Sequence, residues 1–106
     1  MAVSVARARE LALGLGGVSE APHWDRTAFR TPRKIFATLG VAAGDLNLMF
    51  DPERRDFYCG VAPEAFAPVA GGGGRRGATR CELGRVDEET LLGALMAAWR
   101  MAGRKG

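Results

Sequence analysis

Phe29-Arg30-Thr31-Pro32-Arg33-Lys34-Ile35-Phe36-Ala37 is the stretch that decides the fold, because it has the pattern of a compact hairpin. Its charged residues gather around the centre, and apolar residues fill the second half. Pro32 presets the backbone for the second position of a turn and cannot donate to a strand ladder. The β-branched and aromatic residues on either side are therefore predicted to form two short antiparallel strands.

Strand-like sequence continues on both sides of this hairpin, over residues 21–39. On the second strand, Ile35, Ala37 and Leu39 are predicted to face one side, with Lys34, Phe36 and Thr38 on the other. The turn residues Gly44-Asp45 then precede a further predicted strand over residues 46–50.

Helices are predicted at both ends of the chain. Ser4 can cap a first helix that runs to about Leu15, and Asp87 can cap a last helix whose apolar stripe reaches Trp99 in the core. Asp51-Pro52-Glu53 is a strong start for a short helix between them. The cations that suit the negative end of the last helix are Arg100, Arg104 and Lys105.

The segment before the last helix is rich in turn residues. It is expected to hold one strand near Phe66, then a flexible tip at Gly71-Gly72-Gly73-Gly74. A strand over residues 76–83 follows, and Thr79, Cys81 and Leu83 are its expected inner face.

The resulting order of elements is helix, three strands, short helix, one or two strands, helix. It predicts an α+β fold in which the N- and C-terminal helices cover one face of an antiparallel sheet. Such a sheet can leave its other face in water. The side chains expected on that open face are Trp24, Arg26, Arg30, Lys34, Phe36 and Arg80.

Composition limits the class of protein. A chain of 106 residues is expected to form a single domain over residues 1–106. Its net charge of +3 is a mild basic excess, which helps a polyanion to approach. Cys59 and Cys81 lie far apart and are interpreted as small buried apolar side chains. Without a long apolar run or a leader pattern, we expect a cytoplasmic protein with no membrane partner.

Short motifs recur along the chain in an order that resembles the MmcQ/YjbR family, which is related to the CyaY (frataxin-like) fold. They include His23-Trp24, Lys34-Ile35-Phe36-Ala37, Ala65-Phe66-Ala67-Pro68-Val69, Gly77, Val86-Asp87-Glu88-Glu89-Thr90-Leu91 and Ala98-Trp99-Arg100. Ala78 stands where such families usually have an aromatic residue after the glycine. The resemblance implies a CyaY-like fold and a proposed DNA-binding role through a two-winged surface.

The residues alone are compatible with two kinds of partner, a nucleic acid or another protein. Cations of the hairpin and of the loop after the glycines could contact phosphates, while Trp24 and Phe36 stack on bases. The residues assigned to nucleic-acid binding are Trp24, Arg26, Arg30, Arg33, Lys34, Arg75, Arg76 and Arg80. The alternative is a protein-protein interaction module, since Trp and Arg are favoured at interface hot spots.

No catalytic residue, metal ligand or cofactor is predicted. His23 is the only histidine and has no ligand partners at metal-binding spacing. Gly14-Leu15-Gly16-Gly17 follows a helix rather than a strand, so it is interpreted as a helix terminator and not as a phosphate loop. The first helix has a single acid, Glu10, which argues against an acidic iron-binding ridge. We therefore expect a binding protein and not an enzyme.

Overall fold

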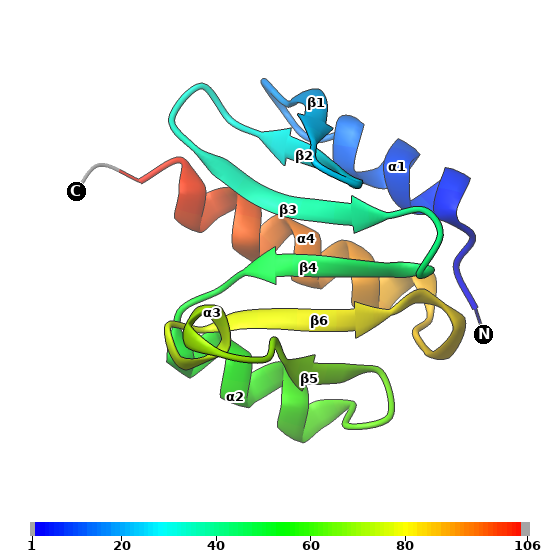
Figure 1. Cartoon of the computed structure of the whole chain (residues 1–106), viewed down its shortest axis with the longest axis vertical. Coiled ribbons are helices and arrows are strands. Elements are labelled where there is room, and N and C mark those ends of the chain that lie inside the picture. Colours follow the sequence, from blue (N-terminus) through cyan, green and yellow to red (C-terminus); the bar gives the residue numbers. More distant parts are fainter. Residues whose placement is uncertain (1, 105–106) are drawn as a thin grey trace.

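The computed structural model describes residues 2–104. Six strands form one antiparallel sheet in the spatial order β1-β2-β3-β4-β6-β5 (Figure 1). In chain order the elements are α1 (Val5–Leu13), β1 (Ser19–His23), β2 (Arg26–Arg30), β3 (Ile35–Gly40), β4 (Asp45–Met49), α2 (Pro52–Val61), β5 (Phe66–Pro68), α3 (Gly72–Arg75), β6 (Ala78–Glu82), a 3₁₀ turn (Leu83–Arg85) and α4 (Glu88–Ala102).

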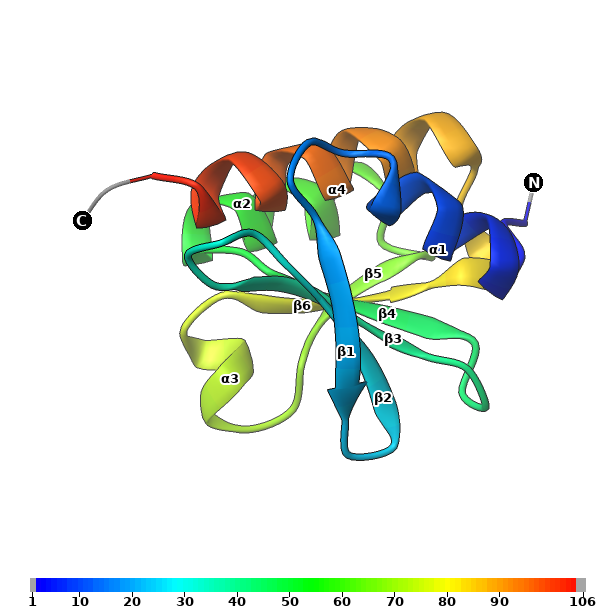
Figure 2. The ribbon, with the colours of Figure 1, turned by 90° about the horizontal axis from the view of Figure 1, so that it is seen from above.

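The helices are distributed unequally over the two faces of the sheet. Figure 2 shows α1, α2 and α4 on one side, with α3 and the tip of the β1–β2 hairpin standing on the other. The terminal helices therefore cover one face, which confirms the predicted α+β arrangement. Among residues 2–104, the only helix on the opposite face is the short α3, and the open part of this face lies between α3 and the β1–β2 tip.

Local signals in the sequence begin the helices as expected. The side chain of Ser4 accepts a hydrogen bond from the Arg7 amide, and Asp51 and Asp87 cap α2 and α4 in the same way. Each cap satisfies a backbone amide that has no partner inside its helix. Lys105, expected to complement the end of α4, lies outside the described residues.

The core lies between the sheet and the helices α1 and α4. Leu46 and Leu48 of β4 are fully buried, as are Thr79 and Cys81 of β6. The burial of Thr79 and Cys81 confirms the inner face predicted for β6. Trp99 differs from the prediction, because it is only partly buried and its indole Nε1 donates to the Gly16 carbonyl over 2.9 Å. Trp99 thus ties the α1–β1 loop to α4 at the margin of the core.

The prediction that Phe36 lies on the open face is wrong. Phe29 pairs with Ala37 and Arg30 pairs with Ile35, so Phe36 is an extra residue on β3. A bulge of this kind re-aims a side chain and breaks the alternation of the strand. Phe36 is fully buried and belongs to the core.

The glycine run is also different from the predicted flexible tip. Its last three residues form α3 together with Arg75, and Gly74 is buried. A Cβ at Gly74 would lie 1.7 Å from the carbonyl oxygen of Val69, which leaves no room for a side chain. The Gly74 carbonyl in turn accepts a 2.7 Å hydrogen bond from Arg55 Nη1. Close backbone packing, and not chain mobility, accounts for glycine at this position.

The two cysteines are expected to differ in reactivity. Cys81 is fully buried in β6, and this burial raises the pKa of its thiol to about 12. Cys59 is partly exposed on α2, and its pKa is also raised by burial. Because the thiolate is the reactive form, iodoacetamide at mildly alkaline pH should modify Cys59 well before Cys81. Peptide mass spectrometry over time checks this order, and equal rates in the folded protein would contradict the burial of Cys81.

Candidate nucleic-acid interface

The residues assigned to nucleic-acid binding fall into three places in the structure. Trp24 lies at the tip of the β1–β2 hairpin, and Arg26 and Arg80 lie on the open face of the sheet. The remaining five lie in the β2–β3 turn, counted from Arg30 at the end of β2, and in or beside α3: Arg30, Arg33, Lys34, Arg75 and Arg76. The three places have different electrostatic surroundings.

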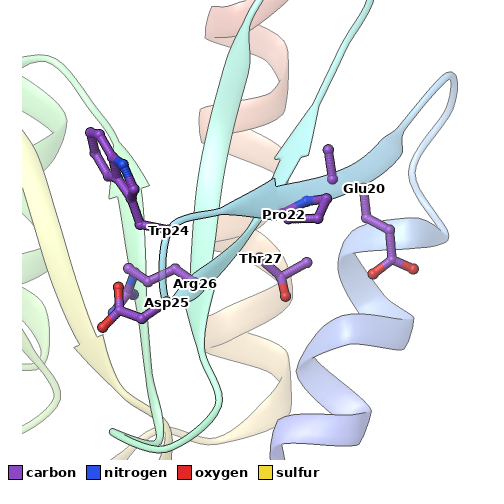
Figure 3. Close-up of a pocket in the computed structure, with 7 residues that line it drawn as sticks. Glu20, Pro22, Trp24, Asp25, Arg26 and Thr27 are labelled. Atoms are coloured by element: carbon purple, nitrogen blue, oxygen red, sulfur yellow. The ribbon is translucent and has the colours of Figure 1, made fainter.

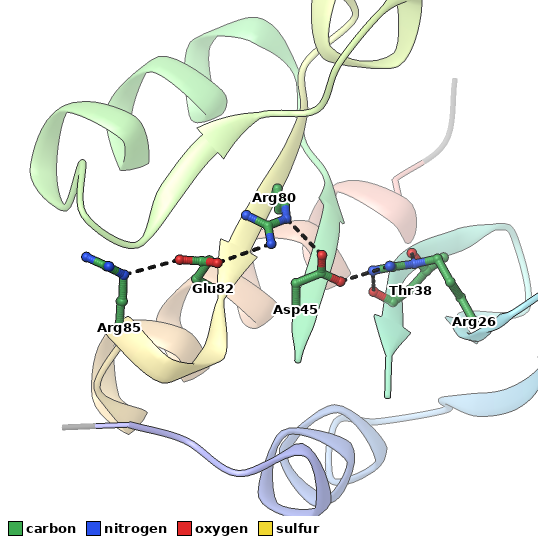
Figure 4. A network of polar contacts seen from close by, with 6 residues as sticks. All are labelled: Arg26, Thr38, Asp45, Arg80, Glu82 and Arg85. Carbon is green, nitrogen blue, oxygen red and sulfur yellow. Dashed lines mark hydrogen bonds and ion pairs between the residues drawn. The ribbon is translucent and has the colours of Figure 1, made fainter. Parts of the chain in front are cut away.

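On the open face, two arginines share one carboxylate. Arg26 Nη1 lies 2.8 Å from Asp45 Oδ1, and Arg80 Nε lies 2.8 Å from Asp45 Oδ2 (Figure 4). Arg26 also donates to the side-chain and backbone oxygens of Thr38, both over 2.9 Å. Since the Asp45 side chain is only 8% exposed, these ion pairs are screened little by water. The network joins β2, β3, β4 and β6 across the sheet.

The same network extends to the end of β6. Arg80 Nη2 contacts Glu82 over 3.2 Å, and Glu82 contacts Arg85 over the same distance (Figure 4). The hydrogen bond to Asp45 raises the pKa of the Arg80 guanidinium above its ordinary value. Asp45 and Glu82 thus balance two of the three positive charges of Arg26, Arg80 and Arg85 within the protein. Arg26 and Arg80 stabilise the sheet and have little charge left for a phosphate.

Gly40 makes room for this arrangement. A Cβ there would lie 2.5 Å from Arg26 Nη1 and 2.7 Å from Asp45 Oδ1. The sequence identifies Asp45 only as part of a turn, because nothing in its spacing from Arg80 shows that the two side chains meet. Their pairing depends on the neighbouring positions of β4 and β6 in the sheet.

A second group of cations lies at one end of the sheet. The β2–β3 turn carries Arg30, Arg33 and Lys34, and Thr31 holds its shape. Thr31 Oγ1 accepts from the Arg33 and Lys34 amides over 3.1 and 3.2 Å, and the Thr31 amide donates to the Lys34 carbonyl. Because Thr31 is buried, this turn presents its three cations from a fixed backbone.

Other elements bring further cations to the same end. Figure 1 shows α3, the start of α2 and the C-terminal end of α4 at the end of the sheet where the β2–β3 turn lies. We call this surface the basic end. Its cations outside internal ion pairs, among residues 2–104, are Arg30, Arg33, Lys34, Arg54, Arg75, Arg76, Arg100 and Arg104.

Three of these cations were missed as site residues in the sequence. From the sequence, Arg100 and Arg104 are expected only to complement the dipole of the last helix, and Arg54 has no predicted role. Neither the residue type nor the exposure of these three arginines indicates that they share a surface with the hairpin. The return of α4 along the sheet brings Arg100 and Arg104 to the basic end, far in sequence from the hairpin.

The opposite end of the molecule has paired charges. Arg7 contacts Glu88 over 2.8 Å and Glu10 over 3.2 Å, and Arg9 contacts Glu20. The hydrogen bonds from Arg7 and Arg9 hold the pKa values of Glu88 and Glu20 below their ordinary range. Since these cations are neutralised by neighbouring acids, the uncompensated positive charge lies mainly at the basic end.

Trp24 is the most exposed large apolar side chain of the described residues, at 92%. It occupies the first of two turn residues between His23 and Arg26, which pair across the hairpin. Its φ of 57° is the only positive value among the described non-glycine residues. Figure 3 shows the indole projecting away from Glu20, Pro22 and Thr27, beside a recess of about 440 Å³ that these residues help to line.

Among the described residues, His, Cys, Asp and Glu do not gather in threes where a metal ion could bind. In the same part of the chain, every helix is too short or too polar to cross a bilayer.

Comparisons with known proteins agree with this fold. The chain superposes on the crystal structure of Deinococcus radiodurans protein DR2400, which has a DUF419 domain, with a TM-score of 0.81 and 20% sequence identity. The match covers 97% of this chain and 80% of that one. No curated protein matches the chain in sequence. The YjbR family model matches residues 13–101, so the chain belongs to the YjbR family, whose function is uncharacterised.

Proposed function

We propose that this protein binds the phosphate backbone of nucleic acid, with DNA as the first candidate, through its basic end. The observation that carries the proposal is the gathering of cations from four separate elements on one surface, outside any ion pair within residues 2–104. The proposal assigns a binding role without catalysis. It moves the phosphate contacts from Arg26 and Arg80 on the sheet face to the β2–β3 turn, α3 and the end of α4.

Electrostatics favour weak and salt-sensitive binding at such a surface. Each phosphate that a Lys or Arg neutralises releases condensed counterions, so affinity falls steeply as salt rises. Four phosphate contacts would lower the affinity about 100-fold between about 50 and about 200 mM salt. Fluorescence anisotropy of a labelled oligonucleotide, titrated with the protein at several salt concentrations, measures this slope. An absence of binding at the lowest salt concentration would contradict the proposal, because electrostatic attraction is strongest there.

Neutralising two cations of the β2–β3 turn should weaken this binding. The double variant Arg30→Gln with Lys34→Gln is expected to bind about 10-fold more weakly and to lower the salt slope by about 2. Both side chains are exposed, so the melting temperature should change little. Anisotropy and thermal unfolding measure the two effects separately.

A control variant changes the net charge equally at the opposite end. Ala2→Glu with Ala6→Glu adds two negative charges at exposed positions just before and within α1, on the helix-covered side of the sheet and away from the β1–β2 tip. This variant is expected to bind like the parent, apart from a small long-range effect that salt screens. Equal weakening in both double variants would show that total charge matters and that the basic end is not the contact surface.

The same titration tests the alternative of a protein-binding surface. The exposure of Trp24 favours this alternative, since Trp is enriched at interface hot spots. An interface anchored by an aromatic side chain responds less to salt than one built on phosphate contacts. Failure to bind oligonucleotides at low salt would therefore favour a protein partner.

A further inference from the structure

Trp24 has an unusual combination of backbone strain and exposure. A two-residue hairpin turn needs positive φ at its first central position, which glycine adopts without a steric clash. Trp24 occupies this position at φ 57°, where a residue with a Cβ meets a steric cost. Strained positions of this kind cluster at functional sites.

Folding gains little from the indole. Its only aromatic neighbour within the described residues is His23, at a ring-centroid distance of 4.9 Å and a tilt of 49°. With 92% of the residue exposed, the ring buries almost none of its apolar surface. An aromatic side chain that is both strained and exposed is better explained by a ligand than by stability.

Trp24 lies on the same side of the sheet as α3, which is part of the basic end. Figure 2 shows the β1–β2 hairpin and α3 standing on the same, open side of the sheet. A nucleic-acid strand held by the cations beside α3 can therefore extend over this open side toward the hairpin. Phe36, the second stacking residue expected from the sequence, is buried, so Trp24 offers a single stacking surface and not a broad platform.

We infer that the Trp24 indole stacks on an unpaired base, and that the protein therefore prefers single-stranded nucleic acid to an intact duplex. This inference rests on the proposed function. In a duplex both faces of each base are already stacked, whereas in a single strand a base can turn outward and cover the indole. The recess of about 440 Å³ beside Trp24 gives such a base space next to the hairpin.

The test compares a labelled single strand with a duplex of the same length and sequence. About 12 nucleotides are enough to span the longest dimension of the molecule, 32 Å, at ~3.4 Å per nucleotide. At low salt, the parent protein should bind the single strand several-fold more tightly than the duplex. Trp24→Gly should weaken single-strand binding about 5- to 100-fold and change duplex binding less than about twofold.

Two further variants separate stacking from general effects. Trp24→Phe keeps an aromatic face and should recover part of the single-strand affinity. Phe57→Ala removes another exposed aromatic side chain, on α2, and should leave the single-strand preference unchanged. Trp24→Gly is expected to keep or raise the melting temperature, because glycine relieves the strain at this turn. Loss of affinity in this variant then does not arise from unfolding.

The outcomes distinguish this inference from the proposed function. Salt-dependent binding without single-strand preference, or equal weakening of both ligands in Trp24→Gly, would overturn the stacking role and leave the backbone contacts standing. If neither oligonucleotide binds the parent protein at low salt, both the inference and the proposed function are wrong.

Discussion

Replacing Phe36 with alanine is expected to lower the free energy of unfolding by about 3–5 kcal/mol. The side chain is fully buried among the core residues of the sheet and helices. Its removal loses the transfer free energy of the ring and leaves a cavity that the neighbours fill only in part. Urea denaturation followed by circular dichroism measures the change.

Phe57→Ala provides the matched control, since it makes the same chemical change at a residue that is 58% exposed. It is expected to cost less than about 1 kcal/mol. If the two variants have similar stability, Phe36 is exposed as the alternation of β3 suggests, and the bulge between β2 and β3 is absent.

Gly74→Ala is expected to have the second large effect, a loss of about 3 kcal/mol or more. The added methyl group would overlap the Val69 carbonyl oxygen, which is backbone and cannot move aside by a change of rotamer. The chain must then shift around α3, which weakens the hydrogen bond from Arg55 to the Gly74 carbonyl. Thermal and urea unfolding report this loss.

Gly72→Ala tests the same helix where space is free. Nothing lies within 4 Å of a Cβ built at Gly72, and alanine favours a helix over glycine. This variant should stabilise the protein by about 0.4–1 kcal/mol. A flexible glycine tip would instead tolerate alanine equally at Gly72 and Gly74, so equal stabilities would contradict the structure of α3.

Much of the fold could be predicted because its signals are local. The caps Ser4, Asp51 and Asp87 begin their helices as expected, since a side-chain oxygen three residues from a free amide needs no distant partner. The strand containing Leu46 and Leu48 also follows its alternation, because β4 is regularly paired on both sides. Phe36 and Gly74 departed from prediction because a bulge and a close backbone contact depend on neighbouring segments.

The candidate site likewise has some features that follow from local sequence and others that depend on contacts between distant segments. Sequence alone determined the α+β class, the hairpin with its cations and the presence of an aromatic side chain at Trp24, since each follows from residue type and short-range spacing. Only the tertiary structure decided which arginines are neutralised by an acid within the protein and which are left to bind a phosphate. It pairs Arg26 and Arg80 with Asp45 and leaves Arg33 outside the ion pairs of the described residues. The physical reason is that charge compensation acts through space, over a few ångströms between strands, and Asp45 and Arg80 lie 35 positions apart in the chain.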